Sequence, residues 1–111
     1  MGNTLNPFEP ARLGGLELKN RFMKAATFEG MTPDGVPGQR LRDFHMGIAK
    51  GGIGLTTLSY CTTEADGRIM DSMMWLHEGI EAKLRDLISA LKSTGVKVSG
   101  QVTLKCLYRL D

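Results

Sequence analysis

The chain has 111 residues, of which 41% are hydrophobic and 23% are charged, a composition typical of a globular chain that can bury a core. Fourteen basic against 12 acidic residues give a net charge of only +2, and the basic residues are dispersed, which excludes a nucleic-acid-binding stripe. There is no signal-peptide pattern, no window near the ~18 apolar residues of a membrane span, and no disulfide or metal spacing at Cys61 and Cys106. We therefore expect a cytoplasmic protein.

The amino-terminal part of the chain predicts short strands. Residues 11–18 (ARLGGLEL) form two alternating pieces around Gly14-Gly15, a dipeptide that tolerates positive φ, and predict a hairpin. The apolar run at residues 22–26 predicts a first core strand. The turn residues of TFEGMTPDGVPG, at residues 27–38, predict a long loop after it.

The next predicted elements are a helix and a second strand. Leu41, Phe44 and Ile48 follow i, i+3, i+7 spacing and predict an amphipathic helix over residues 40–50, which the following glycine pair ends. Residues 53–60 (IGLTTLSY) are rich in β-branched and apolar side chains and predict a strand.

A second helix and a third strand complete the pattern. An apolar stripe over residues 80–91, with an i,i+4 pair of Glu81 and Arg85, predicts the helix, and residues 97–102 predict the strand. Strand, helix, strand, helix and strand at these intervals indicate two right-handed parallel βαβ units. The long loops, residues 27–38 and 60–75, follow strands, so we expect the functional face at the carboxyl ends of the strands.

Four motifs in order carry a family resemblance. They are NPFEPARLGGLELKNRFMKAAT at residues 6–27, AKGGIGLTT at 49–57, DGR at 66–68 and SGQ at 99–101. Together they resemble the opening of the old yellow enzyme family, the FMN-dependent NADH:flavin oxidoreductases. The KAATFE run further resembles the subgroup with dienoyl-CoA-reductase-like and NADH-oxidase-like members. Several ordered motifs are more specific than a single one.

The resemblance implies an α/β fold, the first three βα units of a (β/α)8 TIM barrel preceded by a β-hairpin. A barrel needs about 250 residues, so we expect it to be incomplete here. Residues 1–103 would be the amino-terminal part of an FMN-binding barrel, and residues 104–111 a divergent tail that lacks the family's histidine and glycine-arginine pair. We interpret the chain as an excised or frame-shifted barrel fragment.

The resemblance also implies flavin contacts. Ala25, Ala26 and Thr27 match the segment whose backbone packs on the isoalloxazine. Tyr60 falls at a flavin-contacting position that commonly holds a smaller residue, and Gln101 matches the side chain that hydrogen-bonds the pyrimidine edge. Small residues let a backbone approach a flat ring, and a carboxamide both donates and accepts. We assign no catalytic residue and no metal ligand.

The implied activity is hydride transfer from NAD(P)H through FMN to an activated alkene or a similar small-molecule acceptor. For these 111 residues alone we expect at most feeble flavin binding and no turnover. The alternative is a truncated, non-catalytic α/β fragment that self-associates into homo-oligomers through open strand edges. A different, phosphate-binding barrel enzyme is disfavoured because no glycine-rich phosphate loop is visible.

Several single residues have an ordinary interpretation beside a functional one. We expect Lys24 to snorkel outward between strand and helix, and His45 to be a surface or helix-packing residue. Cys61 is expected to be an inert small hydrophobe. We expect Asp66 and Arg68 to form a loop-shaping ion pair.

Two further features lie in the predicted loops. Glu29 and Glu64 do not form a persuasive acid/base pair. The methionine-rich residues 69–75 fit a substrate lid and a packing surface equally well.

Overall fold

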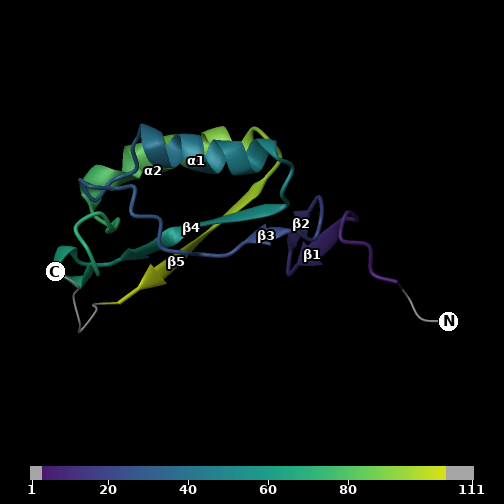
Figure 1. Ribbon diagram of the computed structural model, residues 1–111, viewed down its shortest axis with the longest axis horizontal. Coiled ribbons are helices and arrows are strands. Elements are labelled where there is room, and N and C mark those ends of the chain that lie inside the picture. Colours follow the sequence, from purple (N-terminus) through teal and green to yellow (C-terminus); the bar gives the residue numbers. More distant parts are fainter. Residues whose placement is uncertain (1–3, 105–111) are drawn as a thin grey trace.

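The structure is a computed structural model that describes residues 4–104 (Figure 1). The predicted tail lies outside the described residues from position 105 onward, as does Cys106. In chain order the elements are β1 (Ala11–Leu13), β2 (Leu16–Leu18), β3 (Met23–Lys24), α1 (Gln39–Lys50), β4 (Leu55–Thr62), the short 3₁₀ helices η1 (Ala65–Gly67) and η2 (Glu78–Ile80), α2 (Glu81–Lys92) and β5 (Lys97–Thr103).

The predicted hairpin is confirmed. Strands β1 and β2 pair antiparallel with Leu13 opposite Leu16. Gly14 has φ +60° whereas Gly15 keeps a negative φ, the pattern of a II′-type two-residue loop with glycine first. Figure 1 shows the hairpin at the amino end of β3, away from both helices.

The two predicted βαβ units are also confirmed. Strands β3, β4 and β5 are parallel and lie in that order, and α1 and α2 cover the same side of the sheet (Figure 1). Strand β3 is shorter than the predicted residues 22–26, because the chain after Lys24 leaves the ladder and Glu29 pairs with Ser59 instead. The sheet of the described residues is open and does not close into a barrel.

The core lies between this sheet and the helices. Its main cluster of buried residues comes from α1, β4, α2 and the residue just before β5: Leu41, Ala49, Leu58, Leu87, Leu91 and Val96. A second cluster joins Cys61 and Ile80 to Met74. Met73 and Met74 are both nearly inaccessible to solvent, which supports the packing interpretation for this end of the methionine-rich loop, whereas Met70 is 42% exposed.

Two of the sequence motifs meet at the amino ends of the strands. Asn20 of LKNR donates from Nδ2 to the carbonyl of Gly52 at 2.6 Å and accepts the Phe22 N–H at Oδ1. A Cβ atom at Gly54 would stand 2.6 Å from the Asn20 carbonyl oxygen, so only glycine fits there without a backbone shift. The LKNR and GGIG motifs therefore form one packed joint.

Candidate functional site

The side of the sheet away from the helices, here called the open face, carries polar side chains. The hydroxyls of Thr57 on β4 and Ser99 on β5 lie 2.7 Å apart, and either one can donate. Their neighbours Thr56 and Leu58 face the helices, which places Thr57 on the opposite side because side chains alternate along a strand. Gln101, two residues beyond Ser99, is exposed on this same face.

The predicted segment Ala25–Thr27 reaches the same face. Lys24 pairs in register with Thr56 and points toward α1, so Ala25, next in the extended chain, is directed to the side of Thr57. Ala25 and Thr27 are exposed and Ala26 is partly buried. The structure thus brings Ala25 and Gln101 to one face, at the carboxyl ends of parallel strands.

Tyr60 lies at a β-bulge. The β4–β5 ladder pairs Leu58 with Gly100 and then Cys61 with Val102, so Ser59 and Tyr60 together stand opposite Gln101. Two residues against one is the mark of a bulge, a feature common beside active sites. The Tyr60 ring is partly buried and packs near Phe28, with ring centroids 6.0 Å apart, a partner that the sequence did not indicate.

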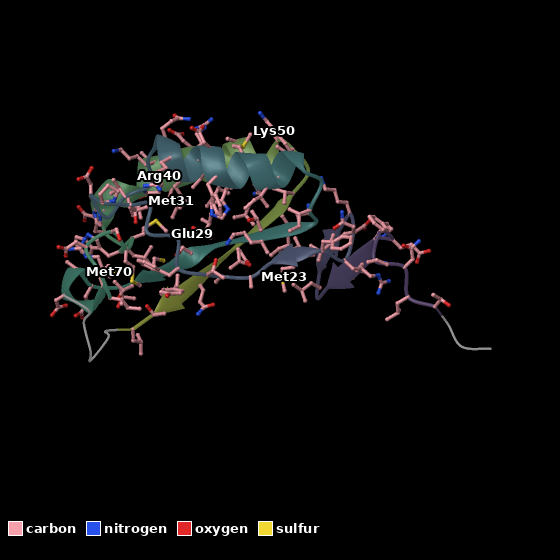
Figure 2. The ribbon with its side chains drawn as sticks, in the orientation of Figure 1. Met23, Glu29, Met31, Arg40, Lys50 and Met70 are labelled. Atoms are coloured by element: carbon pink, nitrogen blue, oxygen red, sulfur yellow. The ribbon has the colours of Figure 1, made fainter. Side chains whose placement is uncertain are left out.

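A buried charged cluster, here called the Glu29 cluster, lies on the helix side of the sheet. Figure 2 shows Glu29 between α1 and the sheet. Its Oε2 is 2.9 Å from the Lys24 ammonium and 2.9 Å from Nε2 of His45. Its Oε1 accepts the backbone N–H of Ser59 at 3.1 Å. The other ring nitrogen of His45 lies 3.0 Å from the Thr56 hydroxyl.

The electrostatics of this cluster favour an ionised Glu29. Burial, which leaves its side chain 2% exposed, by itself raises the pKa, but hydrogen bonds from His45 and Lys24 outweigh that effect and hold the pKa of Glu29 below its usual range. A carboxylate only accepts, so His45 donates from Nε2. The charges of Glu29 and Lys24 balance within the cluster, and the Lys24 ammonium also lies over the Phe44 ring.

Two sequence predictions are corrected here. The Lys24 ammonium does not snorkel to water: it donates to Glu29 and to the carbonyls of Ala25 and Thr57. Of the two interpretations of His45, a surface or a helix-packing residue, the surface one is wrong, since the side chain is fully buried on the inward face of α1. The inward stripe of α1 is Leu41, His45 and Ala49, whereas Phe44 remains 37% exposed. The i, i+4, i+8 spacing of these three residues was the sequence signal that could have indicated the burial of His45.

The remaining candidates are structural. Burial raises the pKa of the Cys61 thiol, which keeps it protonated and agrees with an inert residue. Arg68 does shape its loop, but its ion pair is with Asp71, at 4.0 Å, and its Nε donates to the Ala65 carbonyl. Within residues 4–104 no group of three or more metal-ligating side chains is gathered. Neither of the two described helices has the length and apolar character needed to cross a bilayer.

Comparison with known sequences identifies reductases as relatives. The chain is 41% identical over 95 residues to 4,4'-dithiodibutanoate disulfide reductase of Rhodococcus erythropolis, covering 86% of this chain and 24% of that protein. It is 30% identical over 95 residues to a metal reductase of Desulforamulus reducens, covering 86% of this chain and 14% of that protein. The chain therefore spans a quarter or less of the curated relatives that it matches. A scan against protein-family profiles found no match.

Solved structures share the fold. A 2-naphthoyl-CoA reductase in complex with 2-naphthoyl-CoA superimposes with a TM-score of 0.82 at 26% identity, over 87% of this chain and 15% of that chain. Morphinone reductase in complex with tetrahydroNAD gives a TM-score of 0.78 at 25% identity, over 89% and 27%. The Old Yellow Enzyme of Pichia sp. AKU4542 gives a TM-score of 0.80 at 19% identity, over 87% of this chain and 26% of that chain, and this likeness supports the fold alone.

The predicted fold class is confirmed by these neighbours, because the hairpin, the three parallel strands and the two helices correspond to part of a (β/α)8 barrel. Sequence and structure therefore agree with the ordered motifs: the chain is similar in sequence and in fold to part of the reductases of the old yellow enzyme family.

Proposed function

We propose that this chain supplies part of the flavin-binding edge of an FMN-dependent oxidoreductase that passes hydride from NAD(P)H to a small electron-poor acceptor. The observation that carries the proposal is that Ala25 and Gln101 lie on the same open face, one on each side of β4, toward the carboxyl ends of parallel strands. This is the edge at which ligands of α/β proteins bind.

The residues on that face fit one edge of a flavin. Gln101 offers an exposed carboxamide that can donate to a ring carbonyl and accept from a ring N–H. Ala25 and Ala26 have small side chains and leave room for a flat ring against their backbone. Tyr60 would lie beside the ring. A bound FMN would supply the hydride chemistry, while these residues bind and orient it.

The acceptor is proposed to be an activated alkene or a related small molecule. Because the relative with 41% identity is named for a disulfide, we include organic disulfides in the acceptor class. For the 111 residues alone we expect feeble flavin binding and no turnover, since they span only 24% of that relative.

Titration of the purified chain with FMN, followed by flavin fluorescence, tests this proposal. We expect measurable binding by the wild type and an increase in Kd of about tenfold for Gln101→Leu, the loss of roughly one or two hydrogen bonds. Gln39→Leu, at an exposed glutamine on α1, is the matched control and should leave the Kd unchanged. Absence of binding by the wild type at about 1 mM FMN, a standard free energy near −4 kcal/mol, would contradict the proposal.

A second candidate function, self-association of a non-catalytic unit, is favoured by the edge of β5. Strands β3 and β5 are the edges of the described sheet, and Val102 is 54% exposed. Beside it, an apolar groove of about 270 Å³ runs between α2 and β5 and includes Leu84, Ile88 and Val98. Exposed apolar edges favour pairing with a second copy.

Sedimentation at increasing protein concentration tests this candidate. We expect a dimer in the wild type that Val102→Lys disrupts, because a lysine at the edge opposes strand pairing. Exposed Thr63→Lys serves as the control for the added charge and should leave the dimer intact. A wild type that remains monomeric at all concentrations argues against self-association.

A further inference from the structure

We propose that Glu29 is a positioning residue for the flavin edge: it holds the end of β3 against the bulge of β4, so that Ala25–Thr27 and Tyr60 keep the relative placement that flavin contact requires. The inference deepens the proposed function and rests on it. Glu29 itself faces the helices and does not lie on the open face.

The contact between Glu29 and Ser59 is reciprocal. The backbone N–H of Glu29 donates to the Ser59 hydroxyl at 3.2 Å, and the backbone N–H of Ser59 donates to Oε1 of Glu29 at 3.1 Å. These two hydrogen bonds join positions 30 residues apart in the chain. Thr27 lies two residues before one partner and Tyr60 one residue after the other, so both predicted flavin-contacting segments adjoin this pair.

The carboxylate also anchors the pair to other elements. Lys24 approaches it from β3 and His45 approaches it from α1, each at 2.9 Å. With the Ser59 N–H from β4, three elements meet at one side chain. Because the group is nearly free of solvent contact, these interactions are weakly screened and define one arrangement.

The placement of the charge argues for positioning rather than for stability alone. Buried ion pairs lose much of their Coulombic gain to desolvation, and apolar residues of similar volume often stabilise a fold as well. Elsewhere the contact between the sheet and the helices does use apolar residues, as Leu58 of β4 and Leu87 and Leu91 of α2 show. The charged group occurs where the strand ends and the bulge must be held in register.

The experiment compares the full chain with Glu29→Gln and Ser59→Ala, and with the exposed control Glu17→Gln. Glu29→Gln keeps the shape and an acceptor for the Ser59 N–H but loses the charge that Lys24 and His45 contact. Ser59→Ala removes only the hydroxyl that accepts the Glu29 N–H. Two quantities are measured: the Kd and absorption spectrum of bound FMN, and amide hydrogen exchange at residues 25–29, 59 and 91.

We expect both variants to raise the Kd for FMN about tenfold and to shift the absorption band of the bound flavin. Amide exchange should accelerate at residues 25–29 and 59 but not at Leu91 in α2, which reports on the core. Glu17→Gln should match the wild type in every measurement. A purely structural role would accelerate exchange at all these sites together and leave the flavin spectrum unchanged.

The outcomes separate this inference from the proposed function. If the wild type binds FMN and both variants bind it equally well with an unchanged spectrum, the positioning role is overturned while the proposed function stands. If the wild type binds no FMN, the proposed function fails, and with it the flavin role of Glu29. Equal exchange protection in wild type and variants would then also overturn the Glu29–Ser59 link itself.

Discussion

The two faces of the three-stranded sheet differ in how their side chains are satisfied. Toward the helices, Thr56 and Leu58 of β4 are buried, one bonded to His45 and the other packed in the apolar core. On the open face, the Thr57 hydroxyl lies within hydrogen-bonding distance of the Ser99 hydroxyl, Gln101 is exposed, and Met23 is 60% exposed. The helix side therefore determines the geometry of the sheet, while the open face presents groups that a ligand can contact.

The comparison also explains why a charged cluster and a candidate binding edge occur so close together. The side chain of Glu29, in the loop after β3, lies on the helix side of the sheet. Ala25, four residues earlier, points to the open face. A change on one side of the sheet can thus be transmitted to the other over a few residues of backbone. The predictions below test how far the two faces can be perturbed separately.

The largest effect is expected in the helix-side core. Leu91 is fully buried on α2, so Leu91→Ala should lower the free energy of unfolding by about 3 kcal/mol through lost burial and a cavity. Met23→Ala on the open face should cost less than about 1 kcal/mol, because that side chain is already largely hydrated. Urea unfolding followed by circular dichroism measures both. Similar losses for the two variants would show that the open face is as well packed as the core.

A smaller, pH-dependent effect is expected at the Glu29 cluster. The folded pKa of Glu29 is lowered, so the carboxylate contributes stability that is present above the unfolded value of about 4.3 and is lost as the pH falls through the folded pKa. Lys24 from β3, His45 from α1 and the Ser59 N–H from β4 are the groups that favour its charge. At pH 7 the free energy of unfolding of the wild type should exceed that of Glu29→Gln by about 2 kcal/mol.

This difference in unfolding free energy should shrink as the pH falls below the unfolded pKa of about 4.3 and on through the lowered folded pKa of Glu29. Urea midpoints from pH 7 to pH 3 for both proteins provide the measurement, and carboxylates outside the cluster cancel in the subtraction. A difference that stays constant over this range would mean that Glu29 is not ionised in the folded chain.

The elements that sequence alone predicted are those with local chemistry. The hairpin followed from Gly14-Gly15, and both helices followed from their apolar periodicity. Parallel order followed from the alternation of strands and helices, because parallel strands need crossover connections. Ala25 and Gln101 were predicted from motifs, and the structure places them on one face.

What the sequence could not predict depends on long-range contacts. His45 was expected to be a surface or helix-packing residue, and its full burial is possible because Glu29 and Thr56, 16 and 11 residues away, satisfy its two ring nitrogens. The bulge at Tyr60 likewise depends on pairing with a strand about 40 residues later. No local pattern encodes such partners, so both the Glu29 cluster and the shortness of β3 were missed.

The smallest expected effect, and the sharpest comparison of the two faces, comes from adjacent threonines on β4. Thr56→Val removes the hydroxyl that pairs with a ring nitrogen of fully buried His45 and should cost about 1.5 kcal/mol, since that nitrogen is left without a partner in the interior. Thr57→Val also removes a hydroxyl that has one hydrogen-bond partner, but Thr57 is only partly buried. Because water can replace the lost partner of Ser99, we expect a loss of about 0.5 kcal/mol in the free energy of unfolding. The two substitutions are chemically identical and one residue apart. The difference between their losses of unfolding free energy, measured with urea, therefore reports the difference between the helix side and the open face of the sheet. Equal losses would mean that water does not reach the open face, and the groups proposed to meet a flavin there would instead belong to a sealed interior.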